Sequence, residues 1–426
     1  MKIPILLSLV TFTGITALHA ALPAKPSTGT DWPSYRGPNG NGITSADFGK
    51  AWTSSGPKNL WKAETTNGFS SITVSGNVAA TLVTREFEGS PTEHCVVIDA
   101  SSGKELWAMP LKLAKYNGGG DSGGGGDGAR STPAFDGDKV YVYASNLDLY
   151  CFDARTGKQV WTKDVAGEYG GKNIQWQNAT SPLIEDGLVI VGGGGPGAAF
   201  LAFDKATGAL RWKGGDDKIT HATPTIATLH GVRQVIFFTQ KGLAAVTPKD
   251  GQLLWQQPYK FSVSTAASPV VFEDIVYCSA GYDVGSGAYR ILKKGNDWSS
   301  TEIWRTEGND LANHWSTPVC KDGYLYGMFQ FKEYGKGPVK CVDIRTGEVK
   351  WSQPGFGPGN VIMSGDRVLA LSDKGELVLF NASPDAYKEL ARADVLDGKC
   401  WSTPTLAGGR IFARSTTQAG AFEIAK

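Results

Sequence analysis

One phrase recurs along the chain and constrains the fold more than any other feature: apolar-x-Asp-x-x-Thr/Ser-Gly-x-x-x-Trp. Its cleanest copies are CFDARTGKQVW (151–161), AFDKATGALRW (202–212) and CVDIRTGEVKW (341–351). Self-similarity with a period of about 40 to 55 residues is typical of proteins built from one supersecondary unit per period. Eight units are marked in this way, by Trp61, Trp107, Trp161, Trp212, Trp255, Trp304, Trp351 and, in a degenerate copy, Leu390.

Each unit is predicted to contain four short strands. The Asp can accept hydrogen bonds from turn amides and the Gly can adopt a positive φ, so the phrase predicts a tight hairpin whose second strand carries the Trp. The indole is large enough to bridge neighbouring sheets. A second phrase, Ser or Thr followed by Pro, precedes an apolar strand, where a proline removes no ladder donor. It occurs at Pro133, Pro182, Pro224, Pro269, Pro318 and Pro404.

These units predict an all-β fold, an eight-bladed β-propeller of four-stranded antiparallel blades. The last unit (402–426) supplies only three strands, and the missing fourth is available near the N-terminus in KNLWKAE (58–64). We therefore expect the N-terminal strand to pair with the C-terminal blade and close the ring, which removes an exposed sheet edge. Two separate four-bladed domains are the alternative, but no linker-like break interrupts the series.

The N-terminus predicts export. Met1-Lys2, an apolar run to Leu18 and small residues at Ala20 and Ala21 have the layout of a signal peptide, predicted over residues 1–20. Residues 21–58 are then a leader arm, and residues 59–426 form the propeller. No later window has the length of apolar sequence that a membrane-spanning helix needs. We expect a monomer that is periplasmic or secreted.

Charge and cysteine content exclude some functions. The 42 basic and 41 acidic residues nearly balance, which argues against nucleic acid as a partner. The six cysteines form no CxxC or CxxCH motif, and several lie inside strand-like runs such as LDLYCFDA. An even count in an exported protein permits disulfides, but we favour buried free thiols.

The repeats over residues 59–426 resemble those of the pyrroloquinoline-quinone (PQQ) propeller family, which contains quinoprotein alcohol dehydrogenases and non-enzymatic BamB-like proteins. DWPSYRGPNGNGIT (31–44) resembles the leader that precedes such propellers in planctomycete and verrucomicrobial proteins, and we interpret it as an arm anchored by Trp32 and Tyr35. The resemblance implies the fold more firmly than the function. The chain lacks two marks of the enzymatic members, an adjacent Cys-Cys pair and CxxCH.

The resemblance also implies where a ligand would bind. Quinoproteins hold their cofactor at the channel mouth, where the residues three and four positions before each proline should gather. A planar anionic ligand such as PQQ needs an Arg for its carboxylates, an indole for stacking and amide or imidazole donors. The candidates are Arg130, Asn178, His221, His314, Trp315 and Trp401. The alternative is that these side chains simply plug the channel.

Two functional hypotheses follow. The first is an exported binding or scaffold propeller similar to BamB, which holds a protein, peptide or carbohydrate. The second is a PQQ-dependent dehydrogenase of alcohols or sugars that uses calcium. His94 and His230 are interpreted as solvated residues of loops or turns. The glycine-rich runs 117–130 and 191–200 are interpreted as flexible D–A and B–C loops over the channel mouth.

Overall fold

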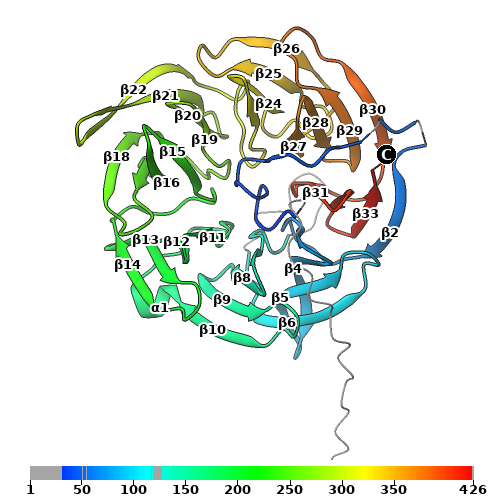
Figure 1. The fold of residues 1–426 in the computed structure, drawn as a ribbon, viewed down its shortest axis with the longest axis horizontal. Helices are drawn as coiled ribbons and strands as arrows, with labels where there is room; N and C mark the ends of the chain where they lie inside the picture. The colour runs from blue at the N-terminus through cyan, green and yellow to red at the C-terminus, as the bar shows by residue number, and fades with distance from the viewer. Residues whose placement is uncertain (1–30, 50, 54, 117, 119–126, 425–426) are drawn as a thin grey trace, which may run out of the picture.

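The computed structural model describes residues 31–49, 51–53, 55–116, 118 and 127–424. The predicted signal peptide, the start of the arm and most of the glycine-rich run 117–130 lie outside these residues. The described chain forms eight sheets arranged as a ring around a central channel (Figure 1), as predicted. No helix of the described residues has the length and apolar character needed to cross a membrane.

The first four blades run in chain order, each from an inner strand A to an outer strand D. Blade 1 contains β3 (Thr73–Ser75), β4 (Val78–Phe87), β5 (Ser90–Asp99) and β6 (Glu105–Leu113). Blade 2 contains β7 (Ala134–Asp136), β8 (Lys139–Tyr143), β9 (Asp148–Asp153) and β10 (Gln159–Asp164). A short helix, α1 (Val165–Tyr169), leads to blade 3, with β11 (Leu183–Glu185), β12 (Leu188–Gly195), β13 (Ala198–Asp204) and β14 (Leu210–Gly214). Blade 4 contains β15 (Thr225–Leu229), β16 (Val232–Thr239), β17 (Gly242–Val246) and β18 (Leu253–Pro258).

The second half continues the same pattern until the last blade. Blade 5 contains β19 (Val270–Phe272), β20 (Ile275–Ala280), β21 (Gly285–Lys294) and β22 (Asp297–Thr306). Blade 6 contains β23 (Val319–Lys321), β24 (Tyr324–Met328), β25 (Val339–Asp343) and β26 (Val349–Gln353). Blade 7 contains β27 (Asn360–Ser364), β28 (Arg367–Leu371), β29 (Glu376–Asn381) and β30 (Glu389–Asp394). Blade 8 contains β31 (Thr405–Ala407), β32 (Arg410–Arg414), β33 (Gln418–Glu423) and the N-terminal β2 (Lys58–Glu64).

The ring is closed by β2, which pairs antiparallel with β33 from Lys58↔Glu423 to Glu64↔Gln418. The two strands lie side by side in Figure 1, the blue one from the start of the chain and the red one from its end. The predicted closure is therefore confirmed. Trp61 of β2 is 8% exposed and packs in the core shared by blades 7, 8 and 1.

The Asp–Gly–Trp phrase works as an interlock between blades. Asp153 Oδ1 accepts hydrogen bonds from the amides of Arg155 and Thr156, which fixes the turn as predicted. Gly157 (φ +71°) then lies against the indole of Trp107 in the preceding blade, where an added Cβ would come within 2.9 Å of the ring. The Trp107 Nε1–H donates to Ala154 O of the same turn at 3.0 Å. The glycine is therefore required both for its φ and for the space above the indole.

This interlock repeats around the ring except at two blades, blade 7, which has Leu390 in place of the tryptophan, and blade 4. Six of the seven tryptophans donate their indole N–H to a carbonyl in the C–D turn of the next blade. Trp255 instead donates to Gln234 Oε1 of its own blade at 2.6 Å. The blade that follows it lacks the Asp–Gly phrase, because its C and D strands extend into a long hairpin from Gly285 to Thr306.

The Ser/Thr–Pro phrase forms a second set of contacts near the channel. Each of the six prolines immediately precedes a strand A. At four of the six prolines, the hydroxyl of the preceding residue accepts an amide hydrogen bond from the preceding blade, as in Ser71 N to Thr132 Oγ1 and Thr132 N to Ser181 Oγ. The same contact closes the ring, from Thr403 N to Ser71 Oγ at 2.9 Å.

The N-terminal arm crosses the channel at the level of the inner strands. Trp32 is 1% exposed and its backbone pairs with Val74 of β3. Arg36 is equally buried and donates to Thr317 O and Pro318 O on the far side of the channel. The arm then adds β1 (Ile43–Thr44) as a parallel fifth strand beside β27. Figure 1 shows this dark blue segment across the middle of the ring.

The cysteines, His230 and His94 can also be compared with what the sequence predicted. All six cysteines are free thiols, five buried and Cys320 half-buried, as favoured. His230 lies exposed in the β15–β16 turn, as expected. The interpretation of His94 is wrong, because the β4–β5 hairpin is longer than its polar sequence suggests. His94 lies within β5, 6% exposed, with Nδ1 3.0 Å from Thr92 O.

The second glycine run connects strands B and C of blade 3, as predicted, but it is not a flexible loop. Gly192 to Gly195 belong to β12, and the turn to β13 consists of Pro196 and Gly197 alone. The absence of side chains lets the segment after α1 approach closely, and Lys172 N donates to Gly193 O at 2.7 Å. These glycines serve close backbone packing.

Candidate functional site

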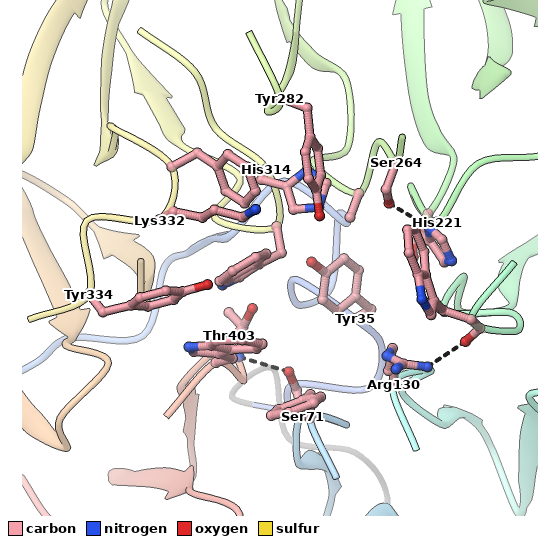
Figure 2. A pocket seen from close by; sticks show the side chains of 18 of the residues that line it. Tyr35, Ser71, Arg130, His221, Ser264, Tyr282, His314, Lys332, Tyr334 and Thr403 are labelled. Atoms are coloured by element: carbon pink, nitrogen blue, oxygen red, sulfur yellow. Dashed lines mark hydrogen bonds between the residues drawn. The ribbon is translucent and has the colours of Figure 1, made fainter. Parts of the chain in front are cut away.

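A cavity of about 240 Å³ lies at the mouth of the channel, where the segments that enter strands A converge with the D–A and B–C loops. Figure 2 shows side chains from around the ring directed into it. Of the predicted site residues, five line this cavity: Arg130, His221, His314, Trp315 and Trp401. The mouth is therefore a lined cavity, although the arm fills the channel beside it.

Asn178 does not take part in this lining. It is fully buried, and its Nδ2 contacts three backbone carbonyls, those of Tyr143, Ala144 and Thr180. Its Oδ1 accepts from the Thr180 amide and hydroxyl. Because its amide is used within the protein, Asn178 fixes the path of the chain before β11, and its proposed role as a ligand donor is not supported.

Tyr35 of the arm completes the cavity from the channel side. Its ring lies in the middle of the circle of side chains in Figure 2, with the arm passing behind it. The neighbouring Arg36 is held by backbone carbonyls of Thr317 and Pro318, and burial lowers its pKa to about 10. This buried guanidinium holds the arm in place, and Tyr35 thereby becomes part of the site.

An aromatic cluster forms one wall of the cavity. The rings of Trp315 and Trp401 lie 4.2 Å apart with an interplanar angle of 33°, and Phe69 stacks on Trp401 at 4.9 Å. The Trp315 Nε1–H donates to Pro358 O at 2.7 Å, which fixes this indole. Trp401 Nε1 is buried and has no partner among the described residues. The wall thus offers a flat apolar surface with one unused donor.

The two histidines of the cavity are uncharged at neutral pH. Burial lowers the pKa of His221 to about 4, and its ring is held by Ser264 Oγ at 2.7 Å and Gln175 O at 3.1 Å. Burial, with the nearby charge of Lys332, lowers the pKa of His314 to about 3. His314 Nδ1 is buried without a partner among the described residues. A neutral imidazole in this position can donate or accept a ligand hydrogen bond.

Three loops that line the cavity carry non-glycine residues in the left-handed backbone region. They hold Trp176 (φ 65°) and Gln177, Tyr282 (φ 57°) and Asp283, and Gln330 and Lys332 (φ 72°). Such conformations are unfavourable for residues with a Cβ, and they cluster at sites that bind ligands. In each loop the strained segment supplies a side chain to the cavity: Trp176, Tyr282 and Lys332.

Several lining residues were not predicted from the sequence. Tyr35 was interpreted only as an anchor of the arm. The others lie in loops of irregular length that no repeat phrase marks, and the B–C loop of blade 6 between β24 and β25 is the richest of them. An excess of aromatic residues in FQFKEYG (329–335) was the available signal. The residues missed are Tyr35, Phe69, Trp176, Tyr282, Phe331, Lys332 and Tyr334.

The ring of eight four-stranded blades and its repeat phrases define the class of the protein, a PQQ-like β-propeller. A family model described as "Outer membrane protein assembly factor BamB" matches residues 91–326 and 335–425. The chain therefore belongs to this family.

The relatives include both BamB proteins and a quinohemoprotein alcohol dehydrogenase. The outer membrane protein assembly factor BamB of Moranella endobia (strain PCIT) is 24% identical over 367 residues, 78% of this chain and 81% of the relative. The quinohemoprotein alcohol dehydrogenase ADH IIB of Pseudomonas putida is 31% identical over 146 residues, but this covers only 30% of this chain and 20% of the enzyme.

Solved structures show the same two similarities at the level of the fold. BamB from Moraxella catarrhalis matches with a TM-score of 0.58 and 15% identity, over 86% of this chain and 97% of that one. Quinohemoprotein alcohol dehydrogenase from Comamonas testosteroni matches with a TM-score of 0.62 and 15% identity, over 93% and 81%. The fold is common to both groups, so the function has to be argued from the site.

Proposed function

We propose that this chain is an exported binding propeller that holds one sugar unit of a carbohydrate at its channel mouth. The observation that carries the proposal is a cavity with an indole wall, three of whose lining residues also contain a buried polar atom without a partner among the described residues. The C–H face of a pyranose packs on an aromatic ring, and its hydroxyls need donors and acceptors around the edge. Trp401 Nε1, His314 Nδ1 and Thr403 Oγ1 are buried without partners among the described residues.

The size of the cavity favours a sugar unit over the other partners considered. About 240 Å³ accommodates one or two rings and not the surface of a folded protein. A protein partner, which membership of the BamB family supports, would bind a different surface. A peptide could place a single side chain here, and it would leave the unused polar atoms largely unsatisfied.

The dehydrogenase hypothesis was tested against the same residues. Arg130 and the Trp315–Trp401 pair would suit a planar anionic quinone. However, none of the described lining residues is an Asp or Glu. No group of three or more His, Cys, Asp or Glu in the described part of the chain could hold a metal ion. Calcium prefers carboxylate and carbonyl oxygens, so the residues do not fit a calcium-bound quinone site.

The proposal is tested by titrating the purified protein with neutral and acidic oligosaccharides and with PQQ plus calcium, following tryptophan fluorescence. We expect at least one oligosaccharide to bind, and the Trp315→Ala variant to abolish that binding while it remains folded. Binding of PQQ and calcium alone, with reduction of a dye by alcohols, would favour the enzyme. The sugar proposal fails if no oligosaccharide binds at millimolar concentration or if Trp315→Ala binds as well as the wild type.

A further inference from the structure

The charged residues that line the cavity are cationic, and the carboxylate of Asp127 pairs with one of them, Arg130, from outside the lining. Two of the described lining residues are cationic, Arg130 and Lys332, and none is an Asp or Glu. They approach from opposite sides of the ring: Arg130 precedes blade 2, and Lys332 lies in the B–C loop of blade 6. Figure 2 shows both cationic groups at the edge of the cavity, with Tyr35 between them. A neutral sugar would need neither charge.

Arg130 is held as a receptor group. Its side chain is 13% exposed, and it donates Nη1 to Trp176 O at 2.6 Å and Nη2 to Asp127 Oδ1 at 2.5 Å. The guanidinium also lies over the ring of Tyr116 at 5.1 Å. Within the described chain these contacts use two of its five N–H bonds, so the planar fork keeps donors for an anionic ligand.

The position of Tyr116 is itself fixed from behind. The Tyr116 hydroxyl donates to Glu93 Oε1 at 3.1 Å, and Glu93 Oε2 accepts from the amide and hydroxyl of Ser145. Glu93 is 1% exposed, and burial raises its pKa. A network of this kind fixes the orientation of the guanidinium before any ligand arrives, which lowers the entropy lost on binding.

Lys332 reaches the cavity at the cost of an unfavourable backbone conformation. Its φ is +72°, and its amine lies 4.6 Å from the centre of the Tyr282 ring, whose own residue has φ +57°. Two strained loops from neighbouring blades therefore cooperate to hold an ammonium group at the edge of the cavity.

We propose that the cavity is selective for an acidic sugar, a pyranose that carries a carboxylate or a sulfate ester. The inference rests on the carbohydrate function proposed above and adds the charge of the ligand to it. The wall formed by Trp315 and Trp401 would receive the sugar ring and Lys332 would contact the anionic substituent, while Arg130, on the opposite side of the cavity, would donate to another oxygen of the ligand. The side chains of His314 and Thr403, which are 8% and 3% exposed, line the same wall and would lie beside the hydroxyls.

The experiment compares ligands that differ only in charge. Trigalacturonate is titrated calorimetrically beside its methyl ester, and a sulfated galactose oligomer beside the unsulfated one. We expect at least one anion to bind about tenfold or more tightly than its neutral partner, as expected for one charge-assisted hydrogen bond. Lys332→Gln should weaken binding of the anion about tenfold and reduce the ratio between charged and neutral ligands, whereas Lys104→Gln, a control in the exposed β5–β6 turn on the opposite face, should change neither quantity.

Each outcome bears on one part of the inference. Binding of trigalacturonate or of the sulfated oligomer shows whether the site takes a carboxylate or a sulfate ester. Equal binding of charged and neutral partners overturns the charge selectivity but leaves the carbohydrate function intact. The absence of all sugar binding overturns both. If an aromatic tricarboxylate binds and no acidic sugar does, the carbohydrate function is wrong and only the preference for an anionic ligand is retained. Arg130→Gln should also weaken binding of the anion, and Arg130→Lys, which keeps the charge without the fork, serves as a second variant if Arg130→Gln fails to fold.

Discussion

The outer belt of tryptophans and the inner mouth of the channel are built from the same eight repeats but follow opposite rules. In the belt, equivalent positions hold the same residue and make the same contact, as when Trp61 and Trp351 both donate to the next blade. At the mouth, equivalent positions before strand A hold Arg130, Ala179, His221, Ala266, Trp315 and Trp401. Regular positions maintain the ring, and irregular positions carry chemistry. In a repeat protein, the departures from the repeat therefore indicate the site.

The largest effect is expected from opening the ring. Deleting residues 58–64 removes the six pairings with β33 and the burial of Trp61. We expect the melting temperature to fall by about 10 °C or more, because a large core aromatic and a full edge strand are lost together. The control Lys58→Ala removes only an exposed ion pair with Glu423 and should leave the melt unchanged. An unaltered melt after the deletion would show that the closure does not stabilise the ring.

The next largest effect shows whether the glycines of the C–D turns are needed only for their positive φ or also for the space beside an indole. Gly157→Ala places a Cβ 2.9 Å from the Trp107 indole at φ +71°, and Gly137→Ala meets a comparable φ (+58°) with no atom within 4 Å. We expect Gly157→Ala to lower the free energy of unfolding by about 3 kcal/mol and Gly137→Ala by about 1 kcal/mol. Urea titration of both variants measures the difference. Equal losses would mean that only the backbone conformation matters.

A smaller effect is expected when the tryptophan of one blade is replaced by leucine, the residue that blade 7 has at this position. Trp161→Leu reproduces the residue found at Leu390 and removes the hydrogen bond to Lys205 O. We expect a loss of about 2 kcal/mol in the free energy of unfolding, against about 1 kcal/mol for Leu390→Ala, which truncates a half-buried side chain. If both variants lose the same amount, the indole does not act as the interlock.

The smallest effect is the pH dependence that the mouth confers. His221 and His314 have folded pKa values of about 4 and about 3, below the usual value near 6.5. The unfolded chain therefore binds more protons in this range, so stability is complete above pH 6.5 and falls as the pH drops towards 4. Between pH 7 and pH 6 we expect a loss of about 1 kcal/mol, which His221→Gln should reduce. A variant that loses as much as the wild type would place the sensitivity elsewhere.

The fold followed from the sequence because its signals are periodic. The Asp, Gly and Trp of each phrase act locally or between adjacent blades, so the spacing of Trp61 to Leu390 predicted both the number of blades and the closing strand. Arg130, His221, His314, Trp315 and Trp401 were predicted from their distance to a proline. Tyr35 and Lys332 were not, because an arm that crosses the channel and a loop in a strained conformation place them by tertiary contacts.

The contrast between belt and mouth is tested most directly with three proteins: the wild type, Trp315→Phe and Trp161→Phe. Calorimetry measures how tightly each binds the oligosaccharide that the wild type binds, and thermal unfolding under the same conditions measures the stability of each. The Trp315→Phe variant should bind about tenfold or more weakly and melt within about 2 °C of the wild type, while Trp161→Phe should melt earlier and bind normally. The opposite pairing, with Trp161→Phe losing affinity and Trp315→Phe losing only stability, would show that the mouth is a structural core and not a binding site.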